Sequence, residues 1–217
     1  MKIIVIGGKG TAVDIGEQVV NAREQYGAKV ELLGWAVDDE SLGPEIIGYP
    51  VLCKPRELAE KFDDPEIKLI FSLYKADKME ERVDLLKSYG IAPSRFANFV
   101  HPLAYVSKNA SLGVGNAVLS FAGIFPNVRM GNHNILYPRS FVGHDTRVGD
   151  NNFFVGAGIG SETVIGNGVF MGMNATITGN VTIGDYAFVG MCANVIKSVE
   201  PRQMVFGNPA RPVPRPV

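Results

Sequence analysis

The chain has 217 residues, a formal net charge of −1 and 46% hydrophobic residues. This composition is typical of one or two globular domains and excludes an intrinsically disordered chain. The near-neutral charge argues against nucleic-acid binding, and no apolar run is long enough to predict a membrane span. The first six residues lead directly into glycines, so no secretory leader is predicted. Cys53 and Cys192 are too few for a disulfide framework, and we expect both to be buried thiols of a cytoplasmic protein.

The two parts of the chain differ in composition. Residues 1–100 carry 13 Lys and Arg, 17 Asp and Glu, and 9 Gly, whereas residues 101–217 carry 8, 5 and 16. Charged residues are typical of solvated helices, and a glycine-rich stretch with few charges is typical of β-structure with tight turns. We therefore predict a boundary at His101-Pro102, with domains 1–100 and 101–217.

The first part alternates strand and helix patterns. Continuous apolar runs predict strands over residues 3–6, 29–37 and 68–72. Thr11 and Asp14 resemble a capping box that opens a helix ending near Tyr26. Proline opens a short helix over residues 55–61, and a helix over residues 77–89 ends at Gly90. This order predicts an α/β Rossmann-like domain with a small parallel sheet.

The second part contains a six-residue repeat. Fifteen positions all hold an aliphatic residue or methionine, in one series from Val106 to Val148 and another from Ile159 to Val195. The two series are out of step by one residue, which is missing somewhere in residues 153–158. Nine of the positions that directly follow are glycine, which we expect to serve the turn conformation. This period predicts a left-handed parallel β-helix of hexapeptide repeats, because an alternating sandwich would have period two.

The only three histidines are His101, His133 and His144. His144 follows a repeat position by two residues, so it is predicted to point outward from a corner. There it can act as a general base if Asp145 orients it. Because adjacent residues of an extended chain point to opposite sides, that pairing depends on the turn. His133 is expected at the surface, and His101 is expected to pack or cap where the coils begin.

Residues 131–149 resemble the site segment of the sialic-acid O-acetyltransferase and nucleotide-sugar N-acetyltransferase family. The resemblance extends over nearly the whole chain, through the glycine-rich first turn, Asp38-Asp39, Gly48-Tyr49-Pro50-Val51, His101-Pro102, the repeat and Gly207-Asn208-Pro209-Ala210. It implies a trimeric acetyl-CoA-dependent enzyme whose first domain binds a nucleotide sugar. It also implies that His144 is the general base and that Asp145 supports it.

The resemblance also implies binding residues. For the nucleotide sugar these are the glycine turn with Gly8 and Gly10 and the acidic pair Asp38 and Asp39. For acetyl-CoA the predicted residues are Phe153, Gly172, Gly190, Lys197, Gly207 and Asn208, with Arg202 and Arg211 as further candidates for its phosphates. Gly172 and Gly190 are expected to let the pantetheine arm approach the backbone. No metal is predicted, because three histidines at one interface would be needed.

The sequence departs from the family pattern at three places. The first turn holds Lys9 where the family commonly has histidine, and the third glycine of a dinucleotide-binding pattern is missing. Phe153 stands where a second histidine often follows the base, which alters the expected contacts at the thioester. The missing residue of the repeat lies just beyond Phe153.

The sequence predicts direct acetyl transfer from acetyl-CoA to an amine on a nucleotide-linked sugar. His144 takes the proton, and backbone N–H groups stabilise the oxyanion. A homotrimer with sites between subunits is expected, with Leu119, Phe121 and Phe125 facing a neighbour or the first domain. Two alternatives stay open: an O-acetyltransferase whose first domain binds no nucleotide, and a non-catalytic β-helix scaffold or metal-binding protein.

Overall fold

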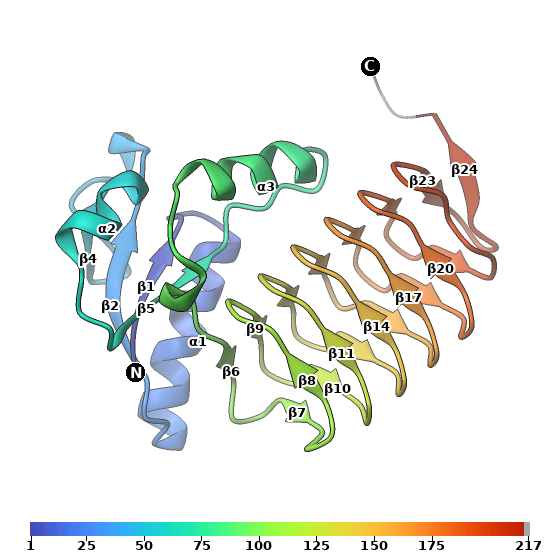
Figure 1. Ribbon diagram of the computed structural model, residues 1–217, viewed down its shortest axis with the longest axis horizontal. Helices are drawn as coiled ribbons and strands as arrows, with labels where there is room; N and C mark the ends of the chain where they lie inside the picture. Colours follow the sequence, from blue (N-terminus) through green and yellow to red (C-terminus); the bar gives the residue numbers. More distant parts are fainter. Residues whose placement is uncertain (215–217) are drawn as a thin grey trace.

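The computed structural model describes residues 1–214, and its first part is an α/β unit (Figure 1). A five-stranded sheet has the order β3-β4-β2-β1-β5, with β4, β2, β1 and β5 parallel. Its strands are β1 (Lys2–Ile6), β2 (Glu31–Ala36), β3 (Glu45–Ile46), β4 (Tyr49–Cys53) and β5 (Ile67–Phe71). The helices are α1 (Thr11–Tyr26), α2 (Leu58–Lys61) and α3 (Met79–Ser88), with short 3₁₀ turns η1 (Glu40–Leu42), η2 (Pro55–Glu57) and η3 (Pro93–Arg95).

The predicted strands and helices of this unit are present with shifted ends, and one local expectation, the capping box, was wrong. Gly10, not Thr11, is the N-cap of α1, and no side chain caps the helix. Asp14 instead accepts a hydrogen bond from the Tyr137 hydroxyl, so its carboxylate is used in a contact with the second part of the chain. The hairpin of β3 and β4 was not predicted, because β3 has only two residues and leaves no alternating pattern.

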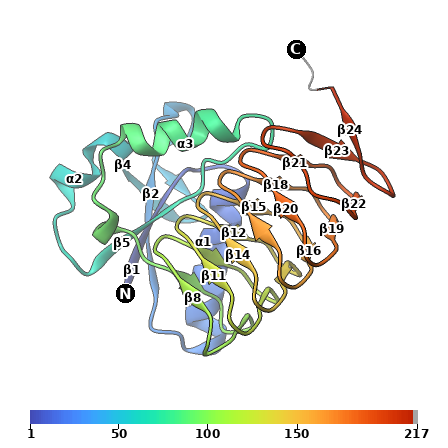
Figure 2. The same ribbon diagram turned by 45° about the vertical axis from the view of Figure 1, so that its right-hand side comes forward.

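Residues 99–206 form a parallel β-helix of three sheets, and Arg211–Val213 adds one antiparallel strand at its end. Face 1 contains β6 (Phe99–Val100), β9 (Ala117–Val118), β12 (Ile135–Leu136), β15 (Phe153–Phe154), β18 (Phe170–Met171), β21 (Phe188–Val189), β23 (Met204–Phe206) and β24 (Arg211–Val213). Face 2 contains β7 (Tyr105–Val106), β10 (Gly123–Ile124), β13 (Phe141–Val142), β16 (Gly158–Ile159), β19 (Thr176–Ile177) and β22 (Asn194–Val195). Face 3 contains β8 (Ser111–Leu112), β11 (Arg129–Met130), β14 (Arg147–Val148), β17 (Val164–Ile165) and β20 (Thr182–Ile183). Figure 2 shows these coils stacked along one axis.

The repeat positions form the predicted inner column, and the structure locates the missing residue. Phe154 continues the column and is fully buried, so the shortened turn lies between β15 and β16. Partners on face 2 are accordingly 18 residues apart for Gly123 and Phe141 but 17 apart for Phe141 and Gly158. The stack absorbs the deletion in one turn without losing its strand pairing.

The glycines that follow the column were expected to serve the turn conformation, and the structure corrects that reason. The residue that adopts the left-handed conformation lies two positions after the one that follows the column. It is mostly not glycine, as at Asn127 (φ 62°) and Asp145 (φ 57°). A Cβ added at Gly172 would lie 2.7 Å from the Met191 nitrogen of the next coil. These glycines are therefore needed because neighbouring coils approach closely.

A ladder of asparagines runs through the corner between faces 3 and 1. The Nδ2 atoms of Asn116, Asn134 and Asn152 each donate to the Oδ1 atom of the asparagine one coil earlier, at 2.9–3.0 Å, beginning at Asn98. Asn116, Asn134 and Asn152 are fully buried. Each Oδ1 also accepts a backbone N–H from the next coil, so these buried polar groups are satisfied by stacking.

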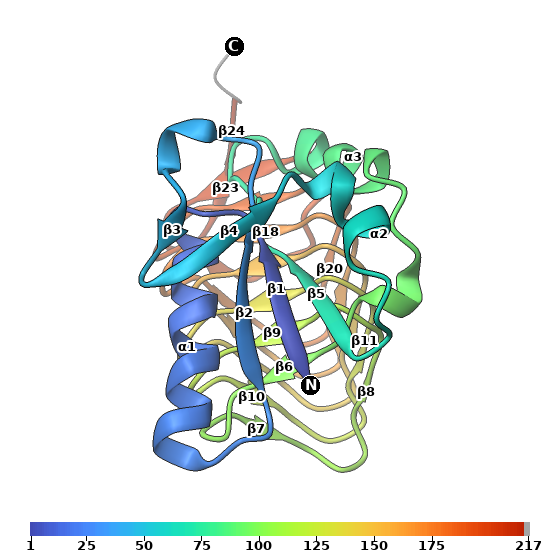
Figure 3. The same ribbon diagram turned by 90° about the vertical axis from the view of Figure 1, so that its left-hand side faces the viewer.

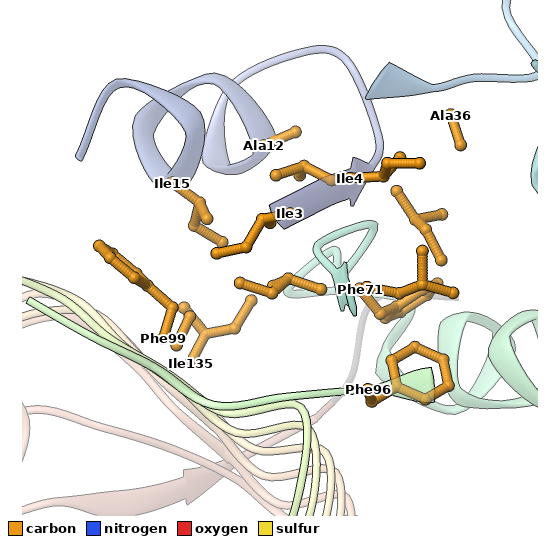
Figure 4. Packing of buried hydrophobic residues seen from close by; sticks show 14 of the residues in the cluster. Ile3, Ile4, Ala12, Ile15, Ala36, Phe71, Phe96, Phe99 and Ile135 are labelled. Atoms are coloured by element: carbon orange, nitrogen blue, oxygen red, sulfur yellow. The ribbon is translucent and has the colours of Figure 1, made fainter. Parts of the chain in front are cut away.

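The α/β unit packs on face 1 through a shared core. Figure 4 shows Ile3 of β1 and Ile15 of α1 beside Phe99 and Ile135 of the β-helix. Figure 3 shows the sheet in front of the coils. Residues 1–214 contain no helix that is both long and apolar enough to cross a membrane.

Candidate functional site

The turn between β13 and β14 brings His144 and Asp145 together. Asp145 adopts the left-handed conformation, with φ of 57°, which turns its side chain back toward its neighbour. The His144 Nδ1 atom lies 2.7 Å from Asp145 Oδ2, and the Asn127 Nδ2 atom donates to Asp145 Oδ1 at 3.0 Å. The turn thus supplies the pairing that an extended chain would forbid. Both side chains are about half exposed, at 54% and 48%.

This arrangement suits proton transfer. The His144 ring and the Asn127 amide hold the pKa of the Asp145 carboxyl below its usual value, so the carboxylate stays ionised. With Nδ1–H donating to that carboxylate, we assign the Nε2 lone pair to the solvent side, where it can accept a proton. His144 therefore has the orientation of a general base with a supporting acid.

His144 lies far from the α/β unit within one chain. The turns that join face 2 to face 3 form one corner of the prism, here called the outer corner, and His144 is part of it. The α/β unit instead contacts face 1 and its two corners. Tyr137 and His101 meet α1 at one of these corners, and His133 and Asn151 meet Tyr74 at the other. The outer corner is opposite face 1, so His144 faces away from the α/β unit.

A cavity of about 630 Å³ lies at the carboxyl ends of β1, β2 and β5. It is lined by the predicted residues Gly8, Gly10, Asp38 and Asp39, together with Tyr74, Lys75 and Arg82 among others. A Cβ on Gly8 would lie 2.7 Å from the side chains of Leu42 and Ile46, so only glycine fits there without displacement. This is the edge at which ligands bind to parallel α/β sheets, beside the start of a helix.

Charged side chains of this cavity are partly paired. Lys9, which replaces the family's usual histidine, contacts Asp39 at 2.7 Å and lowers the pKa of that carboxyl to about 2. Asp38 accepts a hydrogen bond from the Tyr89 hydroxyl at 3.1 Å. Arg82 Nε is buried and has no hydrogen-bond partner within the described residues. Because Arg82 Nη2 already lies 3.7 Å from Glu81 Oε1, its Nε–H is the group left for a ligand, and sequence reasoning missed it because Arg82 is one of many charges on α3.

The residues predicted for acetyl-CoA are not gathered at His144 in one chain. Phe153 is 7% exposed and lies on face 1, where its ring contacts those of Tyr74, Tyr137 and Phe170. The structure thus assigns Phe153 to packing against the α/β unit, and a contact with the thioester is not supported. Gly172 and Gly190 are buried, and added Cβ atoms would collide with the Met191 backbone and the Phe206 ring.

The remaining predicted residues lie in the last coils. Lys197 and Arg211 are exposed, whereas Arg202 pairs with Glu80 of α3 at 2.7 Å and lies over the Tyr186 ring. Gly207 adopts φ of 92°, and its carbonyl accepts the Asn194 N–H. Asn208 Oδ1 accepts a hydrogen bond from Asn194 Nδ2 at 3.2 Å.

Two expectations for single residues were wrong. Cys192 is exposed, because it takes the left-handed corner position, while Cys53 is buried as expected. His133 was expected at the surface but packs edge-on against Phe96, and burial lowers its pKa to about 4. His101 is buried and accepts the Leu103 N–H where the coils begin, as predicted. No three His, Cys, Asp or Glu side chains within residues 1–214 are grouped as a metal site requires.

Comparison with known proteins gives one family model and several relatives. Residues 162–197 match the model described as "Bacterial transferase hexapeptide (six repeats)". GDP-perosamine N-acetyltransferase of Escherichia coli O157:H7 is 30% identical over 189 residues, which cover 82% of this chain and 81% of that protein. Other curated acyltransferases are matched over only 25% to 28% of their own length.

Solved structures match nearly the full length. Perosamine N-acetyltransferase of Caulobacter crescentus, solved with CoA and GDP-perosamine, has a TM-score of 0.80 at 22% identity, over 99% of this chain and 98% of that chain. The acetyltransferase domain of PglB of Neisseria gonorrhoeae FA1090, solved with acetyl coenzyme A, has a TM-score of 0.81 at 22% identity, over 98% of both chains. The predicted left-handed β-helix is confirmed by these matches.

Proposed function

The chain belongs to the nucleotide-sugar N-acetyltransferase family of hexapeptide-repeat acyltransferases, and on that premise we propose that it acetylates an amine of a nucleotide-linked amino sugar with acetyl-CoA. The observation that carries the proposal is the 2.7 Å contact between His144 Nδ1 and Asp145 Oδ2 on an exposed β-helix corner. The relatives solved with CoA, acetyl-CoA or GDP-perosamine support the choice of substrates.

The proposed reaction is a direct transfer. The amine nitrogen attacks the thioester carbonyl, His144 Nε2 takes a proton from that nitrogen, and the C–S bond breaks as the CoA sulfur leaves and receives that proton from His144. Asp145 stabilises the imidazolium that forms, because its ionised carboxylate lies against Nδ1–H. No covalent intermediate with the protein is needed, so neither cysteine has a role.

Residues 1–100 are proposed as a Rossmann-like unit that binds the nucleotide sugar in the 630 Å³ cavity. Gly10 leaves room for phosphate at the start of α1 and Gly8 lies beside it in the cavity, while Asp38 and Asp39 lie at the end of β2, where the nucleoside would bind. Residues 101–217 are proposed as the acyl-transfer unit, of which 215–217 lie outside the described residues. Gly172, Gly190, Lys197, Gly207 and Asn208 remain its candidates for contacts with acetyl-CoA.

The active site is proposed to form between chains of a homotrimer. Within one chain His144 is on the corner opposite the α/β unit, so a sugar held in the cavity must reach the base of another subunit. Apolar side chains on face 2 and its adjoining turns favour such an assembly: Tyr105, Phe121, Phe125, Phe141, Met173 and Met191 are 41% to 68% exposed. Leu119, by contrast, is buried against the α/β unit. A cytoplasmic location, where acetyl-CoA and nucleotide sugars are made, accords with this proposal.

A ligand screen by thermal unfolding tests the proposal, since a ligand that binds only the folded state raises Tm. We expect shifts with acetyl-CoA and with one of the UDP-, dTDP- or GDP-linked amino sugars, and release of CoA when both are present. A shift with acetyl-CoA alone would favour an acceptor without a nucleotide, such as that of an O-acetyltransferase. No shift with any of them would contradict the proposal.

A further inference from the structure

A polar groove of about 640 Å³ runs along face 3 beside the outer corner. The outward side chains of β8, β11 and β14 form its floor. The corner side chains two residues earlier in the chain form its wall. The lining residues are Asn109, Ser111, Asn127, Arg129, Asp145 and Arg147. The groove thus includes the carboxylate that supports His144, and it is separate from the cavity of the α/β unit.

Two arginines of this groove face each other across neighbouring strands. Arg129 and Arg147 are direct partners in the register of β11 and β14, and both are exposed. Like charges placed opposite one another on a sheet are destabilising. None of the ion pairs within residues 1–214 involves either arginine, and Asp145 is already bonded to His144 and Asn127. The pair therefore leaves its positive charge directed at the groove.

We propose that Arg129 and Arg147 bind the phosphoryl groups of the nucleotide-linked acceptor and so hold its amine at His144. This rests on the proposed function and adds a second phosphate-binding element to it, on the chain that supplies the base. Two guanidinium forks match the oxygens of a diphosphate, with charge-assisted hydrogen bonds. Ser111 and the Asn109 amide supply further hydrogen-bonding groups along the groove.

The position of the pair favours the acceptor over acetyl-CoA as the source of the phosphate. Arg147 follows Asp145 by two residues, so their Cα atoms are at most about 7 Å apart. In a nucleotide sugar the phosphate is attached to the same sugar ring that carries the amine. In acetyl-CoA the whole pantetheine arm separates the phosphates from the thioester. A phosphate bound this close to the base therefore belongs to the sugar.

Steady-state kinetics of R129Q/R147Q test the assignment. K2Q/K29Q is the control, because it also removes two exposed charges, near the amino ends of β1 and β2. We expect KM for the nucleotide sugar to rise about tenfold or more in R129Q/R147Q, with KM for acetyl-CoA unchanged, because charge-assisted contacts to the acceptor are lost. The preference for the nucleotide-linked over the free amino sugar should fall by a similar factor. A rise in KM for acetyl-CoA instead, or no change relative to the control, would overturn the assignment.

A second measurement does not depend on acetyl transfer. Phenylglyoxal modifies accessible arginines, and mass spectrometry of the wild-type chain reports each site separately. Inorganic pyrophosphate should slow modification of Arg129 and Arg147 about tenfold while leaving the exposed Arg139 on another corner unaffected. Equal modification with and without pyrophosphate would reject an anion site here even if the protein proves to be an acetyltransferase. Protection without any acetyl transfer would retain the anion site and reject the proposed function.

Discussion

The α/β unit and the β-helix place their functional groups by different means. The α/β unit gathers Gly8, Gly10, Asp38 and Arg82 from separate elements at one edge of a sheet, and several of its charges are neutralised locally, as in Lys9–Asp39. The β-helix instead repeats one backbone geometry every coil and varies only the side chain. A functional residue in the β-helix is thus one changed side chain in a regular series of coils. In the α/β unit, the position of a functional residue depends on how the chain connects the strands.

The largest effect is expected at His144, the proposed base on the β-helix. His144→Gln keeps a polar side chain but removes the proton acceptor, so kcat should fall by a factor of about 10² to 10⁴. Stopped assays of CoA release with nucleotide sugar would measure it, while circular dichroism checks the fold. Retention of full turnover would refute the role of His144.

Glycines that separate coils should be the most sensitive structural positions of the β-helix. Gly172→Ala places a Cβ 2.7 Å from the Met191 nitrogen, and we expect several kcal/mol of destabilisation because backbone must move. Gly123→Ala is the matched control, since its Cβ would meet no backbone atom, only the Phe125 ring at 3.3 Å and the Phe141 Cβ at 3.6 Å. Equal urea midpoints for the two variants would contradict the explanation that Gly172 is required because the next coil approaches it closely.

The buried asparagine ladder should be nearly as sensitive. Asn134→Ala leaves the Asn152 N–H and side-chain amide without their acceptor, which should cost about 2–4 kcal/mol in the free energy of unfolding. Asn132→Ala removes similar side-chain bonds, from the Val114 N–H and to Asp150, at a half-buried corner where water can replace them, so it should cost less. Chemical denaturation of both variants measures the difference. A larger loss of stability in Asn132→Ala than in Asn134→Ala would show that the ladder is not the stabilising feature.

The junction between the two regions should respond to acid. Burial lowers the pKa of His133 to about 4, from an ordinary value near 6.5 in the unfolded chain, so the unfolded state binds the proton first. Stability should therefore fall as pH drops from about 6.5 to 4, by up to about 3 kcal/mol, with no further loss from this group below that. His133→Asn, which suits the left-handed φ of 56°, should flatten that part of the profile. If stability falls as steeply with pH in His133→Asn as in the wild type, the acid sensitivity belongs to other groups.

The smallest effect is expected at a surface pair of the α/β unit. Lys9→Gln removes the contact with Asp39, and because both side chains are exposed the change in stability should be small. Because Lys9 and Asp39 line the cavity, affinity for the nucleotide sugar should change more than stability does. A large fall in Tm with unchanged affinity would reverse that assignment.

The sequence predicted most of the architecture because the repeat is a strong local signal. Period six identified the inner column and the one-residue deletion, and apolar runs identified β1, β2 and β5. The sequence did not predict the exposure of Cys192 or the burial of His133, because both occupy the same turn position and differ only in what packs against their corner. The arginine pair also escaped notice, although Arg129 and Arg147 are 18 residues apart, the length of one coil.

The sequence by itself determined the coil repeat, the residues that fill its interior and the identity of the candidate base, because these depend on local spacing. Only the tertiary structure decided which groups meet. The left-handed corner at Asp145 made the contact with His144, and docking of the α/β unit on face 1 put His144 and the proposed sugar-binding cavity on opposite sides of the chain. Such relations depend on the packing of segments distant in sequence, which hexapeptide spacing does not encode.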